Sequence, residues 1–339
     1  MKNILRKLIP QKIINIFYHL PKAILANLVY GFPARGLKVI GVTGTDGKTT
    51  TVNMICQIIK AAGKKVSMVS TINSPGLHVT SPDPFTIQKL AGEAKQHGDE
   101  YLVLEVTSHA LDQYRFWGIK FDIGVITTIT HEHLDYHKTF ENYSNTKLRL
   151  IRNSKYAVIN HNLSQTIGRP SHVMLSDNVV TFGLDKGDFN QKDLKLKLKV
   201  PGKYNIENAL CSLAVASVLG IDRKIAQKTL ENFEGLTGRM EEIKNKKGIK
   251  IFIDFAHTPN GLEQALRTLR SHIGSGKLIA VFGSAGKRDV GKRQKMGEIA
   301  SSLADYVVLT AEDPRGEIES INKQIMAGVK DKKKIICYK

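Results

Sequence analysis

The stretch GVTGTDGKTTTVNMICQIIKAAG, Gly41 to Gly63, constrains the fold more than any other part of the chain. A short apolar run leads into glycines, a lysine and threonines, and a helical pattern ended by Gly63 follows. Glycines let backbone N–H groups face a phosphate, a helix N terminus adds its positive dipole end, and a lysine neutralises phosphate charge. The stretch therefore predicts a nucleotide-phosphate site at a strand-to-helix turn.

Four residues of this loop have predicted roles. Gly44 and Gly47 shape the backbone, Lys48 contacts phosphate and Thr49 ligates Mg²⁺. The full Walker pattern has a glycine where this chain has Val42, so the context, and not the motif alone, supports the site. A tight turn of small residues is the alternative, but it leaves the order of Lys48 and Thr49 unexplained.

Short apolar runs alternate with helical patterns from Leu37 onward. LKVIGVTG, KKVSMVST, YLVLEVTS and DIGVITTI are expected strands, and SPDPFTIQKLAGEAKQHG is an expected helix. This order predicts an α/β fold with a parallel sheet and helices on both faces. The strict alternation in KDLKLKLKV indicates a further, half-exposed strand.

A second alternation begins after a glycine-containing stretch near Leu236, with expected strands in IKIFIDFA, KLIAVFGSAG and ADYVVLTA. It predicts a smaller, Rossmann-like α/β domain. We expect a basic apolar segment at 1–36, a central ATP-binding domain at 37–236 and a C-terminal domain at 237–339.

The N-terminal segment 1–36 is basic at first and then apolar, but Lys12, His19, Pro21 and Lys22 interrupt it. We do not expect it to cross a membrane, because no clean span of about 20 residues accumulates. A helix packed on the protein's own body is favoured. A helix that lies on a membrane surface or docks on a partner is the alternative.

Composition places the chain among ordinary globular proteins and biases its partners. With 50 Lys and Arg against 31 Asp and Glu, the formal net charge of +19 favours phosphorylated or acidic partners. A nucleic-acid function would depend on this charge alone, since no stacking aromatics or known motif accompany it, and none is expected. Three widely separated cysteines favour the reducing cytoplasm. Nothing here predicts an oligomeric state.

Two further stretches carry candidate ligands. Glu105 ends an apolar strand, and the carboxyl ends of parallel strands face one crevice, so Glu105 is a candidate second Mg²⁺ ligand. HEHLDYH contains His131, His133 and His137, but its spacing matches no standard zinc site. A Mg²⁺ or phosphate role for one histidine is more economical, with the other histidines structural.

The ordered motifs resemble those of the Mur ligases, and in particular the branch that adds the third amino acid to the peptidoglycan stem peptide. The motifs are GVTGTDGKTTT, EVTSHALDQYR, HEHLDYH, YSNTKLRL, PGKYNIENAL, GLTGRME, DFAHTPNGLEQAL, VFGSAGKRDVGKR and TAEDPRGE. The resemblance, over about Leu37 to Glu317, implies an ADP-forming ligase that uses ATP and Mg²⁺. A carboxylate of a UDP-muramyl peptide is phosphorylated, and the incoming amino group attacks the acyl phosphate.

The resemblance also implies residue roles. The ATP loop comprises Gly44, Thr45, Gly47, Lys48, Thr49 and Thr50. Thr49 and Glu105 match ligands of one Mg²⁺, and His133 matches a ligand of the second. Lys147 matches a carbamylated lysine that acts as a carboxylate-like metal ligand, although the sequence alone suggests a solvated helix residue. Catalytic roles are expected for Lys48, Lys147 and His257.

Contacts to nucleotide and substrate are implied in the same way. Asn205 and Asn208 match adenine-side asparagines, while Arg239 and Asp254 match nucleotide contacts from the C-terminal domain, across a hinge near Leu236 to Gly238. The positions that match holders of the muramyl peptide are Thr80, Ser81, Thr107 and Arg115. The positions that match basic residues around the incoming amino acid are Arg288 and Arg315. Arg315, in EDPR, favours an amino acid with a distal carboxylate, such as meso-diaminopimelate.

Three departures from the family pattern leave alternatives open. Asp46 replaces the usual loop asparagine, and segment 1–36 stands where an N-terminal UDP-binding domain is expected. The given sequence stops at KKKIICYK, before the place where the family has a late Gly-Lys-Gly-His-Glu segment that helps to bind the incoming amino acid. A ligase with another acceptor, of the folylpolyglutamate or cyanophycin type, is one alternative. A non-catalytic nucleotide-binding module that docks on a membrane or partner is another.

Overall fold

The computed structural model describes residues 9–72, 80–166, 178–286, 289–313, 315–331 and 334–337. The chain divides into two compact units. Unit 1 comprises Met1–Ile129, Ser144–Leu198 and Ile206–Phe233, and unit 2 comprises Thr130–Tyr143, Lys199–Asn205 and Glu234–Lys339. Each unit is therefore assembled from separate stretches of sequence. The predicted domain ranges 1–36, 37–236 and 237–339 stay a prediction.

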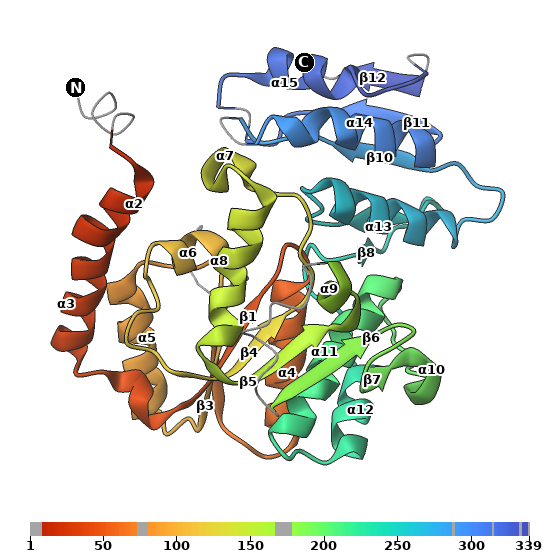
Figure 1. The fold of residues 1–339 in the computed structure, drawn as a ribbon. Coiled ribbons are helices and arrows are strands. Elements are labelled where there is room, and N and C mark those ends of the chain that lie inside the picture. The colour runs from red at the N-terminus through yellow and green to blue at the C-terminus, as the bar shows by residue number, and fades with distance from the viewer. Residues whose placement is uncertain are drawn as a thin grey trace. The chain divides into compact units, whose positions relative to one another are not determined.

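A parallel sheet forms the centre of unit 1 (Figure 1). Its seven strands lie in the order β2 (Val66–Val69), β3 (Tyr101–Glu105), β1 (Lys38–Thr43), β4 (Phe121–Ile126), β5 (Ser154–Asn160), β6 (Val179–Gly183) and β7 (Phe189–Asn190). Every neighbouring pair is parallel. The predicted α/β class is confirmed, and β1 is central because β3 and β4 pair with its two edges.

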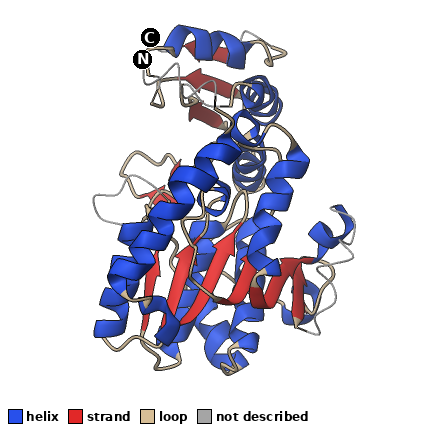
Figure 2. Cartoon of the chain, turned by 60° about the vertical axis from the view of Figure 1, so that its left-hand side comes forward, coloured by secondary structure: helices blue, strands red, loops and turns tan. Residues whose placement is uncertain are grey.

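Helices cover both faces of this sheet (Figure 2). The helices that follow β1 in this unit are α4 (Lys48–Ala61), α5 (Pro84–Gln96), α6 (Ser108–Asp112), α8 (Phe140–Arg152, whose first residues belong to unit 2), α9 (His161–Thr166), α10 (Gln191–Leu194), α11 (Lys203–Val218, whose first residues also belong to unit 2) and α12 (Arg223–Glu231). The local sequence explains the ends of several helices. The Asp83 side chain caps α5 by accepting from the backbone N–H of Phe85, and Gly63 follows α4 with a φ of 74°.

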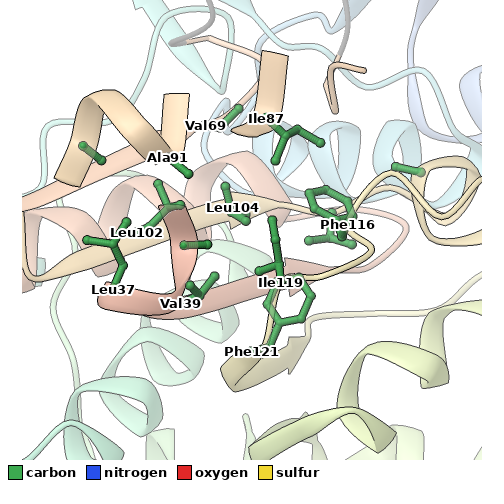
Figure 3. Packing of buried hydrophobic residues seen from close by; sticks show 14 of the residues in the cluster. Leu37, Val39, Val69, Ile87, Ala91, Leu102, Leu104, Phe116, Ile119 and Phe121 are labelled. Atoms are coloured by element: carbon green, nitrogen blue, oxygen red, sulfur yellow. The ribbon is translucent and has the colours of Figure 1, made fainter. Parts of the chain in front are cut away.

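The alternation of side chains along β3 determines the face of the sheet to which Glu105 points. Leu102 and Leu104 pack against Ile87 and Ala91 of α5 in one buried cluster (Figure 3). Because successive side chains of a strand point to opposite faces, Glu105 points to the other face, where α4 begins.

Unit 2 has its own sheets and core. An antiparallel pair joins β8 (Glu241–Ile243) and β9 (Ile251–Ile253), and a parallel sheet has the order β10 (Ile279–Phe282), β11 (Tyr306–Leu309) and β12 (Ile335–Cys337). Its helices are α7 (Leu134–His137), α13 (Pro259–Arg270), α14 (Gly291–Leu303) and α15 (Ile318–Met326). The core between these helices and the parallel sheet includes Leu266, Met296, Val307 and Ile325. The predicted second α/β domain therefore contains a parallel sheet of its own.

The N-terminal segment forms a helix from Gln11 to Tyr30, followed by the 3₁₀ turn η2 (Pro33–Gly36). The helix consists of α2 (Gln11–Ile14), a π-helical turn η1 (Asn15–His19) and α3 (Leu20–Tyr30). It packs along α5 within unit 1. Its length and composition would suffice to cross a membrane.

The strand predicted in KDLKLKLKV is wrong. After α10 this stretch runs on without strand pairing, although its side chains alternate between buried and exposed from Leu194 to Lys197. The side chain of Gln191 donates to the carbonyl of Leu196 and accepts from the N–H of Leu196. It thus occupies backbone groups that a neighbouring strand would use, so the alternation reflects packing without a sheet.

Candidate functional site

The predicted phosphate loop connects β1 to the N terminus of α4. The N–H of Thr45 donates to the carbonyl of Thr128 at 2.7 Å, and Thr127 Oγ1 donates to the carbonyl of Asp46 at 2.6 Å. These bonds attach the outer side of the loop to the chain that follows β4. No side chain in the described structure caps the α4 N terminus, so its first-turn N–H groups and dipole suit an anion.

Two glycines let the backbone approach its neighbours closely. A Cβ on Gly44 would overlap Thr127 Oγ1, and a Cβ on Gly47 would overlap Asn208 Oδ1. Gly47 also has a φ of 83°, which disfavours any side chain. The loop is thus a cradle of backbone that larger residues would fill, and it fits a phosphate chain.

The buried Glu105 carboxylate organises the adjacent edge. Thr49 Oγ1 lies 3.0 and 3.1 Å from its two oxygens, and the N–H and hydroxyl of Thr71 donate to Oε2 at 2.9 and 3.0 Å. Glu105 is 2% exposed. The predicted pair of Thr49 and Glu105 is therefore brought together. Sequence reasoning missed Thr71, although its place directly after β2, beside β3, could have indicated it.

Two lysines converge on one carbonyl oxygen of the loop. Lys48 Nζ donates to Gly44 O at 3.0 Å and to Thr45 O at 2.8 Å, while Lys147 Nζ donates to the same Gly44 O at 2.7 Å. Lys147 is 1% exposed, so the expectation of a solvated helix residue is wrong. It lies on the inner side of α8, and its Nζ, like that of Lys48, lies beside the predicted phosphate site.

Asn208 supplies a polar group that the protein itself does not satisfy. It is buried, its Oδ1 accepts from Thr51 Oγ1 at 3.3 Å, and its amide nitrogen has no hydrogen-bond partner among the described residues. A buried amide donor without a partner is costly, so a ligand acceptor fits this position. Asn208 lies beside Gly47, which agrees with a nucleotide at this end of the loop.

Glu207 precedes Asn208 on α11 and faces β5. Asn160 Nδ2 donates to its Oε1 at 3.2 Å. Burial raises the pKa of Glu207, and this hydrogen bond opposes the shift.

The residues predicted to hold the muramyl peptide gather beside Glu105. Ser81 Oγ donates to the carbonyl of Glu105 at 2.9 Å and accepts from the N–H of Thr107 at 3.1 Å. Arg115 donates to the carbonyl of Ser81, and the hydroxyls of Thr80 and Thr71 lie 3.0 Å apart. The four predicted residues therefore form one network with the carboxylate edge.

The HEHLDYH stretch belongs to unit 2, whereas the residues of the Glu105 network belong to unit 1. His131 stacks on Phe140, and His137 is buried against Tyr143. His133 has a φ of 57°, which is uncommon outside glycine and typical of functional positions. The packing of His131 and His137 agrees with structural roles and leaves His133 as the candidate ligand.

Glu132 forms a buried ion pair that sequence reasoning missed. Lys292 Nζ of α14 lies 3.0 Å from Glu132 Oε1, with side-chain exposures of 8% and 3%. His133 Nδ1 lies 3.9 Å from the same oxygen. The pair therefore attaches the histidine-rich stretch to the core of unit 2.

The predicted nucleotide contacts of the C-terminal region share a second part of unit 2. Asp254 Oδ2 accepts from the N–H of Met240 at 2.8 Å, and the Arg239 guanidinium lies over the Phe255 ring at 4.6 Å. His257 Nδ1 lies 3.0 Å from the carbonyl of Phe255. Burial and the nearby Asp254 raise the pKa of Tyr204, a neighbour that sequence reasoning missed.

The remaining predicted residues have separate positions. Asn205, in unit 2, donates to the carbonyl of Pro201 at 2.7 Å, while Arg315 pairs with Asp313 at 2.7 Å. Arg288 lies outside the described residues. Thr45 is buried in the loop, and Thr50 is buried in the first turn of α4.

Across the ranges described, no group of three His, Cys, Asp or Glu side chains could hold a metal ion. Mg²⁺ commonly binds one or two carboxylates, and water and phosphate oxygens complete its ligand set. The Thr49 and Glu105 pair has that character.

Comparisons with protein families agree with this arrangement. The family model described as Mur ligase middle domain matches residues 42–216, and the model described as Mur ligase, glutamate ligase domain matches residues 238–338. The UDP-N-acetylmuramoyl-L-alanyl-D-glutamate--2,6-diaminopimelate ligase of Clostridium tetani is 38% identical over 335 residues, which cover 91% of this chain and 68% of the relative.

Solved structures give the same grouping. A UDP-N-acetylmuramoyl-L-alanyl-D-glutamate--2,6-diaminopimelate ligase structure matches with a TM-score of 0.58 and 28% identity, over 90% of this chain and 68% of that one. Folylpolyglutamate synthase of Mycobacterium tuberculosis matches with a TM-score of 0.70 and 17% identity, over 94% and 85%. At that identity the second likeness shows the fold alone.

Proposed function

The chain belongs to the Mur ligase family, and from this premise we propose that it is an ATP-dependent ligase that adds an amino acid to a UDP-muramyl dipeptide in peptidoglycan precursor synthesis. The family uses ATP. The two lysines that converge on Gly44 O, beside the buried Thr49 and Glu105 pair, are the observation that carries the proposal. Such a site suits the transfer of a phosphoryl group, because the negative charge of that group spreads over several oxygens that the site can stabilise.

The proposed reaction has two steps. A carboxylate oxygen of the dipeptide attacks the γ-phosphorus, and the bond to the leaving ADP breaks. The amino nitrogen of the incoming amino acid then attacks the acyl carbon, the nitrogen loses a proton and inorganic phosphate leaves as the amide bond forms. Mg²⁺, when bound, neutralises charge on the phosphate oxygens.

We assign the residues of unit 1 to these steps as follows. The loop N–H groups and Lys48 bind the phosphates, and Asn208 offers its amide nitrogen to the nucleotide. Thr49 and Glu105 would hold one Mg²⁺, with Thr71 fixing the carboxylate. Thr80, Ser81, Thr107 and Arg115 would hold the dipeptide.

Further assignments follow from the family resemblance. His133 would contribute to a second Mg²⁺ site, and a carbamylated Lys147 would serve as a carboxylate-like ligand. Arg239, Asp254 and His257 would contribute nucleotide and reaction contacts from the predicted C-terminal domain 237–339, with 37–236 as the ATP-binding domain. Arg288 and Arg315 would bind the incoming amino acid. We propose meso-diaminopimelate as that amino acid and the cytoplasm as the location.

The test is ADP release from Mg·ATP and UDP-N-acetylmuramoyl-L-Ala-D-Glu, with meso-diaminopimelate, lysine or no amino acid in parallel. We expect turnover that needs both the muramyl dipeptide and meso-diaminopimelate. Turnover with lysine instead would overturn the amino-acid assignment, and ATP binding without any turnover would overturn the ligase proposal for this acceptor.

A matched pair of variants tests the phosphate site. Lys48→Ala should lower turnover by about 10²–10³-fold, since it removes a positive charge from the transferring phosphoryl group. Lys60→Ala, which removes an exposed lysine from the last turn of the same helix, should retain turnover. Equal activity of the two variants would argue against the proposed role of Lys48.

A further inference from the structure

The N-terminal helix Gln11–Tyr30 presents large apolar side chains to solvent. The exposed fractions are 77% for Phe17, 53% for Leu25, 62% for Leu28 and 63% for Val29. Helices on the surface of a globular protein usually direct charged or polar residues outward. A contiguous apolar face of this kind marks an interaction site more often than a bare surface.

The inward side of the same helix carries the small and polar residues. Asn15, Ala23, Ala26 and Asn27 are buried, and they recur at the spacing of one helical face. The helix therefore buries its small and polar residues and exposes its large apolar ones. Packing on the protein's own body explains the inward face, but it does not explain the apolar outward face.

Hydrogen bonds within unit 1 fix which face points outward. Asn27 Nδ2 donates to the carbonyl of Trp117 at 2.7 Å, and Asn15 Nδ2 donates to Asp112 at 2.6 Å. A Cβ on Gly118 would overlap the Asn27 amide, so the fit here is close. Hydrogen bonds near both ends hold the helix along the body of unit 1. This attachment suits a helix that lies on a membrane surface better than one that crosses a membrane.

The charged residues of the N-terminal stretch of sequence are all basic. Residues 1–45 contain no Asp or Glu, and their seven cations are Lys2, Arg6, Lys7, Lys12, Lys22, Arg35 and Lys38. Lys22 forms an ion pair with Asp83 at 3.3 Å, whereas Lys12, Arg35 and Lys38 are exposed. Cations beside an apolar face are complementary to anionic headgroups above hydrocarbon.

We propose that the outer face of this helix, Ile13, Phe17, Leu25, Leu28 and Val29, docks the enzyme on the surface of a bilayer that contains anionic phospholipid. The helix lies parallel to the surface, and its apolar side chains enter the boundary between headgroups and acyl chains. Tyr18, Tyr30 and Trp117 are also partly exposed, and aromatic residues of this kind favour the membrane interface. The proposal does not depend on the ligase assignment.

Vesicle binding of the full chain tests this proposal. Co-sedimentation should be measured with vesicles of phosphatidylcholine alone and with vesicles that also contain phosphatidylglycerol. We expect at least about tenfold stronger partitioning onto the anionic vesicles, weakened by salt, because each basic residue near such a surface strengthens binding about fivefold. Trp117, the chain's single tryptophan, should show a blue-shifted emission on binding.

Paired variants separate the apolar face from general surface apolarity. Leu28→Glu should reduce partitioning by about tenfold or more, since it places a charge in the apolar face. Ile225→Glu, at an exposed apolar position of α12 in the same unit, should leave partitioning unchanged. Both variants should retain the wild-type circular dichroism spectrum and ATP turnover.

Three outcomes would overturn the proposal. The first is no preference for anionic vesicles, and the second is an equal effect of Leu28→Glu and Ile225→Glu. The third is a dimer, detected by light scattering, that Leu28→Glu dissociates while the wild type ignores vesicles. In that case a second copy of the chain, and not a membrane, covers the face.

Discussion

At the residue scale, the burial of Lys147 is the most informative feature of the site. A buried ammonium group loses its hydration and needs compensating partners. Lys147 Nζ donates to Gly44 O at 2.7 Å and lies 3.4 Å from Thr43 Oγ1, both on or beside the phosphate loop. A position that is this deep and this close to the loop suits a group that acts on the bound ligand, and it is compatible with the carbamylated lysine of the family.

We expect Lys147→Ala to be inactive and to regain part of its ATP turnover when short-chain carboxylic acids are added. The added carboxylate would occupy the space left by the modified side chain and restore an oxygen ligand for Mg²⁺. Turnover should be measured across a series of such acids, with Lys155→Ala, an exposed lysine on β5, as the control. Full activity of unrescued Lys147→Ala would remove this residue from the metal site.

Glu207 predicts a dependence of stability on pH. Burial raises its pKa in the folded state, so the folded protein holds the proton of this carboxyl group more tightly than the unfolded chain does. The resulting stabilisation is present below the unfolded-state pKa and is lost as pH rises through the folded-state pKa. The Gln side chain of Glu207→Gln carries no charge at any pH. The free energy of unfolding of the variant should therefore increase relative to that of the wild type as pH rises from about 4 to about 8.

Urea denaturation across this pH range is the measurement for Glu207. A constant difference between variant and wild type would show that the carboxyl group does not titrate differently in the two states.

At the scale of elements, the Lys292 and Glu132 pair connects α14 to the segment before α7. Both side chains are nearly fully buried, and the pair lies beside His133. Removal of one partner from a buried pair leaves an uncompensated charge, whereas replacement of both by apolar groups is often neutral. The pair therefore controls how firmly the histidine-rich stretch is held.

Lys292→Met should lower the free energy of unfolding of unit 2 by about 3–5 kcal/mol, because Glu132 stays buried without its cation. The double variant Lys292→Met with Glu132→Met should recover most of that loss. Chemical denaturation of both variants gives the comparison. If the single and double variants were equally unstable, lost packing and not unpaired charge would be the cause.

At the scale of the whole molecule, the chain contains separate hydrophobic cores. One lies between α5 and the unit 1 sheet, and another lies among α13, α14, α15 and the β10 to β12 sheet. Units with cores of their own can unfold as separate cooperative transitions.

We predict two thermal transitions, of which fluorescence of Trp117 reports that of unit 1. A non-hydrolysable ATP analogue at about one hundred times its dissociation constant adds about 2.7 kcal/mol, which should raise the unit 1 midpoint by about 5–10 °C. The shift should vanish in Lys48→Ala. A single thermal transition, at which the Trp117 fluorescence changes together with the rest of the protein, would show that the units unfold together.

The sequence by itself determined the class of the fold and the phosphate loop. Apolar runs of strand length identified β1, β3 and β4, and glycines beside Lys48 and Thr49 identified the turn, because these signals are local and follow from backbone chemistry. The ordered motifs also identified the family, since each one combines residue types that packing alone does not require.

Only the tertiary structure decided which residues meet. Alternation in KDLKLKLKV predicted a strand, yet the side chain of Gln191 satisfies the backbone of Leu196. No local pattern pairs Thr71 with Glu105 or Lys292 with Glu132, because these partners lie 34 and 160 residues apart in sequence. The outward face of the N-terminal helix likewise depends on bonds to the region of Trp117. Such contacts depend on the three-dimensional arrangement, which no local pattern of residues records.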